Sequence, residues 1–412
     1  MMSTRRKALK TLTAIPFVGG IFGPSILAAK AAEETVAKSA LPVSGAVARD
    51  FFKELGLRTF INAAGTYTSM TGSLMHKEVT DAISYGATEY VNLDELHDKV
   101  GERIAELLDC EYATVSSGAF GAMTIGLAGV MCGMDEKKVA QLPDTKGLKN
   151  EVIVQKAHAI GYTHALINTG AKIVEIETAK ELEKAINDNT AMLWFLNANT
   201  DQGQIKYEEF VALGKKHNVP TFIDCAADVP PVENLFKFTK LGFDLVCFSG
   251  GKGIRGPQSA GLLLGKRKYI EAARLHTPPR GATIARGMKV NKEEVLGMMV
   301  ALELYLARDH KKEWELWEDQ IKLISDSAAS VKGVETEIHV PPHANHVPSL
   351  YIRWDEKVVG ISTDEMRKRL RDGHPSIETV GNKEQVGITT WMMEPGQERI
   401  VAQRVKEVLE SA

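Results

Sequence analysis

The feature that most constrains the fold is an apolar strand that ends in a glycine-lined loop carrying one lysine. Residues 243–249 are of strand length with an apolar centre over 245–248, and glycines stand on both sides of Lys252 in the loop that follows. Upstream, the apolar strand 220–223 ends at Asp224, which precedes Lys252 by 28 residues. This spacing fits one strand-loop-strand excursion in an α/β sheet, where functional side chains lie at the carboxyl ends of the strands.

The chemistry of these two residue types points to pyridoxal 5'-phosphate (PLP). A lysine amine can form a Schiff base with the PLP aldehyde, and a carboxylate can bind the ring nitrogen. The amine must be deprotonated to attack a carbonyl, and burial among apolar strands lowers its pKa toward neutrality. Taken singly, Lys252 could be a loop lysine and Asp224 a strand end. The pair favours PLP, with Lys252 and Asp224 as the catalytic residues.

A third element predicts a phosphate site. Residues 113–116 form a short apolar strand, which runs through Ser117, Gly118 and Ala119 into an apolar helical pattern. Free backbone N–H groups at a helix N-terminus suit a phosphate dianion. Ser249, three residues before Lys252, can donate a further hydrogen bond. Many α/β proteins have such a turn for packing, so its weight comes from the order along the chain: turn, aspartate, lysine.

Two further loops carry weaker candidates for cofactor binding. His158 follows the strand 151–155 and could cover one face of the cofactor ring, although a lone histidine is equally well a surface or core residue. Asn199 or Gln202 follows the strongly apolar strand 191–195 and could reach the phenolic oxygen of the cofactor. The alternative for this second loop is a polar turn.

Four stretches, residues 55–65, 90–96, 249–260 and 286–294, resemble the fold-type I PLP family that includes selenocysteine synthase and D-glucosaminate-6-phosphate ammonia-lyase. The similarity covers most of residues 50–412. It implies an α/β fold with a doubly wound, mostly parallel sheet and a smaller α+β domain. It also implies that Lys252 holds the cofactor, Asp224 its ring nitrogen, and the turn 117–119 its phosphate.

The resemblance also implies a substrate region. Arg280, Arg286 and Lys289 would lie near the active site, supplied across a dimer interface, because an arginine fork suits a carboxylate or phosphate. The alternative is a solvated basic segment. Tyr67, in the N-terminal arm, is a further candidate for substrate binding. We therefore expect a homodimer or larger homo-oligomer that acts on a small amino-acid-like molecule.

The expected reaction is removal of the substrate's Cα proton, β-elimination, and release of ammonia and a keto acid. The same carbanion chemistry leaves aminotransferase, racemase and aldolase activity open. A hypothesis of another class is an exported phosphate- or nucleotide-binding protein without turnover. Lys252 lacks the following Ser or Thr of a P-loop, which argues against that alternative. A role with tRNA is disfavoured because the resemblance begins only near residue 50.

The N-terminus predicts export. Arg5, Arg6 and the basic residues beside them precede a moderately apolar run from Thr11 to Ala29, as in a twin-arginine signal peptide over residues 1–31. Prolines and glycines interrupt the run, so a permanent membrane anchor is the less favoured alternative. We expect a periplasmic or otherwise exported protein, with residues 32–48 as a linker.

Composition agrees with a soluble enzyme of two domains. The chain has 412 residues, 44% of them apolar, and a formal net charge of −3, which becomes −8 without residues 1–31. Nothing there favours nucleic acid or an anionic membrane. The four cysteines lack metal spacing, and we expect buried free thiols and no metal site.

Domain boundaries follow from the element pattern. We expect an N-terminal arm and large PLP domain over 49–290, and an interdomain helix and small domain over 291–412. One long amphipathic helix over 292–317 is predicted to link the two, and the proline-rich segment 341–348 to form a loop.

Overall fold

The computed structural model describes residues 49–411, so the predicted signal peptide and linker lie outside the described residues. The chain divides into two compact units, 1–58 and 59–412. In the first, the described residues form the short helix α2 (Phe51–Glu54), which begins after Asp50, whose side chain accepts a hydrogen bond from the Lys53 N–H. All that follows concerns the second unit.

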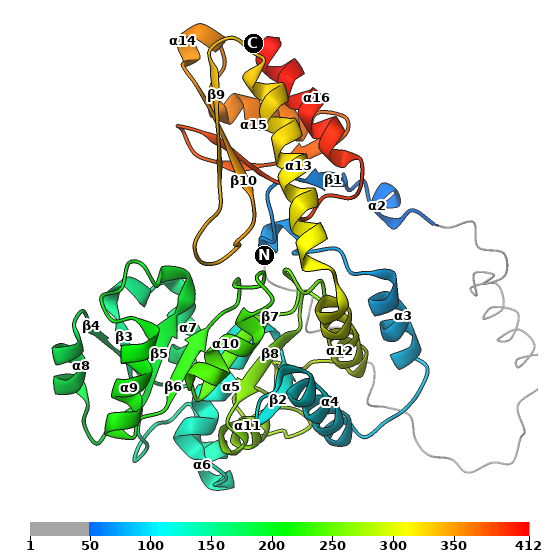
Figure 1. The fold of residues 1–412 in the computed structure, drawn as a ribbon. Helices are drawn as coiled ribbons and strands as arrows, with labels where there is room; N and C mark the ends of the chain where they lie inside the picture. The colour runs from blue at the N-terminus through cyan, green and yellow to red at the C-terminus, as the bar shows by residue number, and fades with distance from the viewer. Residues whose placement is uncertain (1–48, 412) are drawn as a thin grey trace, which may run out of the picture. The chain divides into compact units, whose positions relative to one another are not determined.

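A seven-stranded sheet forms the larger part of this unit (Figure 1). Its order is β2-β8-β7-β6-β5-β3-β4; β3 to β7 run parallel, and β8 is antiparallel to its neighbours β2 and β7. The strands are β2 (Tyr112–Ser116), β3 (Glu151–Gln155), β4 (Lys172–Ile176), β5 (Thr190–Leu196), β6 (Thr221–Asp224), β7 (Leu245–Ser249) and β8 (Gly261–Gly265). The predicted doubly wound, mostly parallel sheet is confirmed.

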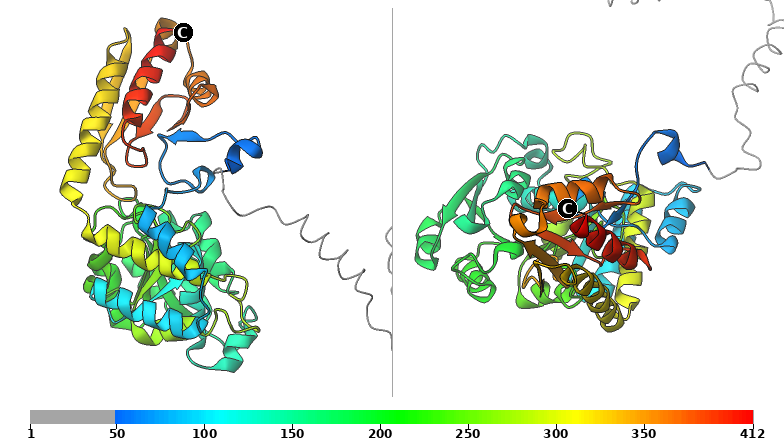
Figure 2. Two further views of the ribbon diagram at one scale, coloured as in Figure 1. Left: turned by 90° about the vertical axis from the view of Figure 1, so that its right-hand side faces the viewer. Right: turned by 90° about the horizontal axis from the view of Figure 1, so that it is seen from above.

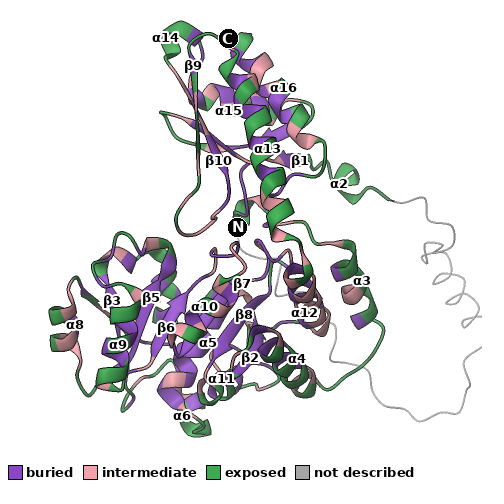
Figure 3. Cartoon of the chain, in the orientation of Figure 1, coloured by how far each residue is buried: buried purple, intermediate pink, exposed green. Residues whose placement is uncertain are grey.

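Both faces of this sheet are covered, because its central strands are apolar on both sides. All seven residues of β5 are buried, with Met192 and Trp194 in one core cluster and Leu193 and Phe195 in another. Alternation of side chains along a strand puts these pairs on opposite faces. Figure 3 shows the strands buried and the outer helix surfaces exposed. The helices are α3 (Lys77–Gly86), α4 (Leu93–Leu108), α5 (Gly118–Cys132), α6 (Glu136–Gln141), α7 (His164–Ile167), α8 (Ala179–Ala185), α9 (Tyr207–His217), α10 (Asn234–Leu241), α11 (Arg267–Arg274) and α12 (Lys292–Ala307).

A four-stranded antiparallel sheet of order β12-β13-β10-β9 and its helices form what we call the small subdomain. Its strands are β9 (Val334–His339), β10 (Ser349–Trp354), β12 (Val380–Gly381) and β13 (Val386–Thr389), and its helices are α13 (His310–Ala329), α14 (Glu356–Val359), α15 (Thr363–Asp372) and α16 (Gln397–Glu410). Helices α13 and α16 lie side by side (Figure 2). The segment 341–348 joins β9 to β10 as a loop, as predicted.

A parallel pair of short strands ties the start of this unit to the small subdomain. Strand β1 (Phe60–Asn62) pairs with β11 (Ser376–Glu378), and Ile61 and Ile377 are both buried in the small-subdomain core. Thr389 also donates its N–H to the carbonyl of Ala63 at 2.9 Å. Residues 60–63 therefore pack on the small subdomain.

The prediction of one helix over 292–317 is wrong, because the first helix ends at Arg308 and a second begins after Asp309. Helix α12 ends there in an extended residue, and Asp309 caps α13 by accepting a hydrogen bond from the Lys312 N–H at 3.1 Å. Helix α12 contacts α3 and α4, whereas α13 contacts β9, β10 and α16. An aspartate N-cap begins a new helix, and the run of polar residues over 308–313, with Asp309 in it, was a signal of the break available in the sequence.

Candidate active site

A cavity of about 490 Å³ lies between the carboxyl ends of the central strands and the small subdomain. Asp224, Ser249 and Lys252 line it from the large sheet, and Thr389 and Trp391 line it from the small subdomain. Tyr67 and Ala119 also contribute to the wall. The structure therefore brings together Lys252, Asp224, Ser249, Ala119 and Tyr67, five of the residues predicted from sequence.

Lys252 lies in a tight turn between β7 and β8. Arg255 donates its N–H to the Lys252 carbonyl at 2.9 Å, and Gly256 donates to the carbonyl of Gly250 at 2.8 Å. Burial lowers the pKa of the Lys252 amine below its usual value, and the carboxylates of Asp224 and Asp228 oppose that shift. The amine therefore loses its proton more easily than a solvated lysine does, as a nucleophile for an aldehyde requires.

Asp224 is the last residue of β6 and is 3% exposed. Its Oδ1 accepts hydrogen bonds from the Ala226 N–H at 2.9 Å and from the Cys247 thiol at 3.6 Å. Burial raises the pKa of this carboxyl, and both hydrogen bonds and the Lys252 charge work against that rise. A cation inside the cavity would hold Asp224 ionised, which suits a protonated ring nitrogen.

The predicted phosphate turn forms the start of α5. Ser117 is the N-cap residue and its side chain makes no capping hydrogen bond, while Gly118 has a φ of +64°. A β-carbon placed on Gly261 would lie 2.5 Å from the carbonyl carbon of Gly118, so a glycine in β8 allows this close approach. The first N–H groups of a helix have no intrahelical acceptor, and they remain for an anion.

These features fit PLP. The cavity volume lies in the usual range of small-molecule sites. Lys252 would hold the cofactor aldehyde, Asp224 its ring nitrogen, and the turn from Ser117 to Ala119 its phosphate. Each group has the charge and hydrogen-bonding character that its share of the cofactor needs.

His158 and Asn199 are not brought to this cavity. His158 is fully buried; its Nδ1 accepts from the Leu196 N–H at 3.2 Å and its Nε2 donates to the Asn199 carbonyl at 3.1 Å. The ring packs edge-on against Phe195, and burial lowers the pKa of His158 to about 4. The Asn199 side chain donates to the Ala157 carbonyl at 2.6 Å. Both side chains hold two loops together, which differs from the predicted roles in stacking and oxygen binding.

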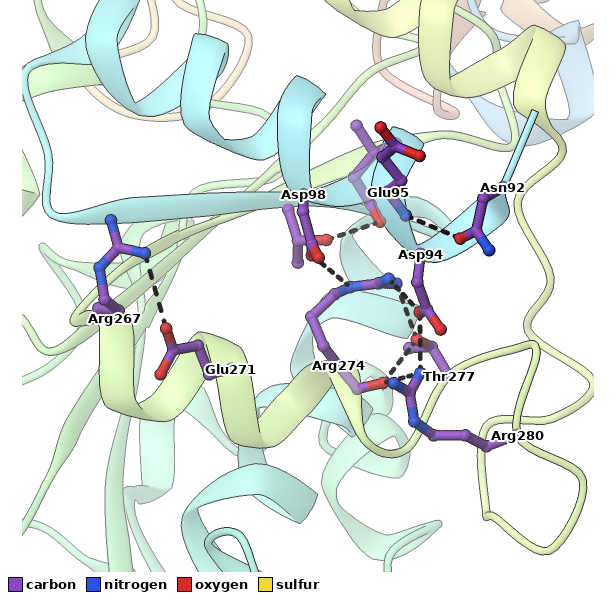
Figure 4. Close-up of polar contacts among 11 residues, drawn as sticks. Asn92, Asp94, Glu95, Asp98, Arg267, Glu271, Arg274, Thr277 and Arg280 are labelled. Carbon is purple, nitrogen blue, oxygen red and sulfur yellow. Dashed lines mark hydrogen bonds and ion pairs between the residues drawn. The ribbon is translucent and has the colours of Figure 1, made fainter.

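Arg280 and Arg286 also lie outside the cavity wall of one chain. Arg280 donates to Asp94 Oδ1 at 3.0 Å, beside Arg274, which binds the same oxygen at 2.8 Å (Figure 4). Arg286 is exposed. Arg280, one of the two arginines predicted to bind substrate, is therefore paired with Asp94 of its own chain.

Replacing Asp94 by alanine is expected to lower the free energy of unfolding by about 2 kcal/mol, because Arg274 is buried and would lose its main counter-charge. The matched control is Asp81→Ala, since Asp81 pairs with Lys77 on the surface and should change stability by less than about 0.5 kcal/mol. Urea unfolding of the three proteins checks this. Equal losses in the two variants would contradict it.

Several residues of the cavity wall were not predicted from the sequence. Asp228 is 2% exposed and lies in the wall four residues after Asp224. Its position just beyond the carboxyl end of a central strand was an available signal. Phe120, Tyr162 and Trp391 also line the cavity, and no local pattern distinguishes them from other aromatic residues.

Gly253 sets the distance between the lysine loop and the segment after Asp224. A β-carbon on Gly253 would lie 2.2 Å from the Val229 carbonyl oxygen. We expect Gly253→Ala to lower the free energy of unfolding by about 1–3 kcal/mol and to reduce turnover, because the loop must shift. Gly281→Ala is the control, since a β-carbon there meets nothing within 4 Å. Urea unfolding and steady-state kinetics measure both effects, and wild-type behaviour of Gly253→Ala would refute the packing argument.

Comparisons with known proteins show the family of this chain. Residues 60–340 match the family model of L-seryl-tRNA selenium transferase. The D-glucosaminate-6-phosphate ammonia lyase of Salmonella typhimurium is 26% identical over 379 residues, covering 88% of this chain and 99% of that protein. The L-seryl-tRNA(Sec) selenium transferase of Aquifex aeolicus is 26% identical over 377 residues, covering 78% and 77%.

Solved structures show the same fold. The structure of a D-glucosaminate-6-phosphate ammonia-lyase superposes with a TM-score of 0.77 at 25% identity, covering 89% of this chain and 100% of that one. Serine palmitoyltransferase, solved with PLP, matches at a TM-score of 0.55 and 12% identity, over 85% of this chain and 88% of that one, and so shares the fold. With a family model matched over most of its length, this chain belongs to the L-seryl-tRNA selenium transferase family and has the fold-type I architecture of PLP enzymes.

Proposed function

We propose that this protein is a PLP-dependent lyase that releases ammonia from an amino acid or amino-sugar acid by α,β-elimination. The observation that carries the proposal is the placement of Lys252 and Asp224 in the wall of one buried cavity. The match to an ammonia lyase over nearly its whole length supports elimination over the other reactions open to the same residues. PLP is the cofactor expected of this family and fold.

Each step of the proposed reaction can be assigned to particular residues of this chain. PLP supplies an electron sink for the negative charge that develops at the substrate Cα. Lys252 would hold the cofactor, and its free amine would accept the Cα proton, because burial favours the neutral amine. The Asp224 carboxylate would hold the ring nitrogen in its protonated form. The N-terminus of α5 and Ser249 would bind the phosphate.

The small-subdomain wall offers hydrogen bonds to the substrate. Trp391 Nε1 and Thr389 Oγ1 are buried and have no hydrogen-bond partner in the described chain. An indole N–H can only donate, so its partner must be an acceptor oxygen. A substrate carboxylate or hydroxyl supplies one, and an unmade bond there costs about 1–3 kcal/mol. These residues therefore suit an oxygen-rich amino acid.

The test is a spectroscopic titration of the purified protein, loaded with PLP, against D- and L-amino acids and amino-sugar acids, with ammonia measured in the same wells. A visible band that shifts with one substrate class, with ammonia released in the absence of a keto-acid acceptor, supports the lyase. Conversion of the cofactor to its amine form without net ammonia would indicate an aminotransferase. Absence of any cofactor band after PLP is added would refute the proposal.

We also propose that the protein forms a homo-oligomer. Tyr85 and Tyr90 expose most of their surface, as does Leu74, and large apolar side chains in this number favour burial against another chain. Arg286, exposed on its own chain, is then available to a neighbouring copy. Light scattering of the purified protein tests the assembly, and a monomer mass with full activity on dilution would exclude it.

Export is proposed from the residues before the described part of the chain. The basic segment with Arg5 and Arg6 and the apolar run after it support a twin-arginine signal. In the described part of the chain, no helix is long and apolar enough to cross a bilayer. Cell fractionation of the native protein and of an Arg5→Lys, Arg6→Lys variant tests this. We expect the variant to remain in the cytoplasm, and an unchanged distribution would refute the signal.

A further inference from the structure

A second buried carboxyl lies in the cavity beside the proposed lysine and aspartate. Asp228 is 2% exposed, lines the same cavity as Asp224 and Lys252, and has no part in holding PLP as set out above. A carboxyl in a closed cavity is costly to ionise unless it is paired or used. Asp228 therefore has a structural role, a chemical role, or both.

The backbone places Asp228 next to the lysine loop. Val229 and Gly253 pack so closely that a β-carbon on Gly253 would lie 2.2 Å from the Val229 carbonyl oxygen. Asp228 directly precedes Val229, and Lys252 directly precedes Gly253. The two cavity-lining side chains thus start from adjacent backbone segments.

The small subdomain fixes this carboxyl from the opposite side. Ala344 donates its N–H to Asp228 Oδ1 at 2.9 Å, and Asn345 donates its N–H to the Ala227 carbonyl at 2.7 Å. Both donors come from the loop between β9 and β10. Asp228 is therefore held where the two parts of the cavity wall meet.

The surroundings of Asp228 make its carboxyl easier to protonate than a solvated one. Burial and the Asp224 charge raise its pKa, hydrogen bonds from Ala344 and Asn197 and the Lys252 charge lower it, and the balance places that pKa at about 6. An acid with a pKa near the working pH is well suited to proton transfer. The two carboxyls of this cavity can thus differ in protonation. Asp224 is ionised when a protonated ring nitrogen lies beside it, and Asp228 can carry a proton.

We propose that Asp228 is the general acid that protonates the leaving group at the substrate Cβ. The inference rests on the proposed elimination and names the residue that completes it. Lys252 takes the proton from Cα, the electrons of that bond form the Cα–Cβ double bond, and the Cβ–O bond breaks with its electron pair going to oxygen. The Asp228 proton joins that oxygen, and water leaves. The proton held by Lys252 then passes to Cβ of the enamine product, water hydrolyses the resulting imine to keto acid and ammonia, and solvent returns a proton to Asp228.

The test compares two amino-acid substrates that differ only in the leaving group. Hydroxide leaves only with a proton, whereas chloride leaves without one. For Asp228→Asn in the holoenzyme, we expect kcat/KM with the β-hydroxy substrate to fall about 10²-fold or more, and kcat/KM with the β-chloro substrate to change less than about threefold. Asp244→Asn, a buried carboxyl outside the cavity wall, is the control and should affect both substrates alike.

A second readout does not depend on turnover. A carboxyl whose pKa is higher in the folded protein than in the unfolded chain stabilises the fold below its unfolded pKa and loses that contribution as pH rises toward 6. Relative to Asp228→Asn, the melting temperature of the wild type should therefore fall between about pH 4 and pH 7. Parallel melting curves across this range would overturn the assignment of a protonated Asp228.

Other outcomes are equally decisive. Equal losses with both leaving groups would show that Asp228 only positions its loop, and would overturn the proposal. If Asp228→Asn fails to fold, Asp228→Glu keeps an acid and should retain the reaction of the β-hydroxy substrate; selective loss of that reaction there would contradict the proposal. Absence of ammonia from both substrates with the wild type would refute the proposed elimination itself.

Discussion

Replacing Lys252 by alanine is expected to abolish covalent attachment of PLP and to lower ammonia release by at least about 10³-fold. The side chain has two tasks that alanine cannot perform, bonding to the cofactor aldehyde and taking the Cα proton. No other lysine lines the cavity among the described residues. Mass spectrometry after borohydride reduction measures attachment, and an ammonia assay measures turnover.

Lys268→Ala is the matched control, because Lys268 is exposed on α11 and lies over the Tyr269 ring, away from the cavity. It should retain both attachment and turnover. Since Lys252 is largely buried, its removal can also change stability, so melting curves of both variants accompany the assay. A Lys252→Ala protein that still carries PLP covalently would place the attachment at another residue.

Replacing Asp224 by asparagine is expected to lower turnover on the order of 10²- to 10³-fold while PLP remains attached to Lys252. The substitution keeps shape and removes charge, so the ring nitrogen loses the partner that holds its proton and the electron sink weakens. A shift of the cofactor absorption band is expected beside the loss of rate. Both are measured on the purified holoenzyme, with ammonia as the product.

Asp244→Asn separates chemistry from folding. Asp244 is also a buried carboxyl, but it directly precedes β7 at the amino-terminal end of that strand; its Oδ2 accepts from the Thr221 N–H at 2.8 Å and its Oδ1 pairs with Lys266. Its neutralisation should lower stability and leave turnover per folded molecule near the wild-type value. If Asp224→Asn and Asp244→Asn behave alike, the role assigned to Asp224 is incorrect.

Local patterns predicted most elements of the fold. Alternating apolar strands and helices predicted the central sheet, and the proline-rich segment 341–348 forms the predicted loop between β9 and β10. The break between α12 and α13 was missed because residues on both sides of it favour helix, although the polar run 308–313 with the N-cap Asp309 marks it; the different packing partners of the two helices make it plain. The pairing of β1 with β11, more than 300 residues apart, depends on contacts that no local pattern contains.

The candidate site was predictable where chemistry and strand position coincide. Lys252 and Asp224 stand at the carboxyl ends of apolar strands, and parallel pairing of β6 and β7 brings those ends to one edge of the sheet. Asp228 also lies just beyond the carboxyl end of β6, but only Asp224 was predicted as a site residue. Trp391 reaches the cavity only because the small subdomain folds over it.

The sequence by itself determined the strands, the glycine-lined lysine loop and the residue types of a PLP site, because these depend on the hydrophobic period and on the reactivity of single side chains. Tertiary structure decided which polar groups remain available. His158 is occupied by backbone partners and Arg280 by Asp94, whereas Asp228 is brought beside the lysine loop. A side chain's hydrogen-bond partners and burial are set by segments distant in sequence, and they fix whether it serves the fold or the chemistry.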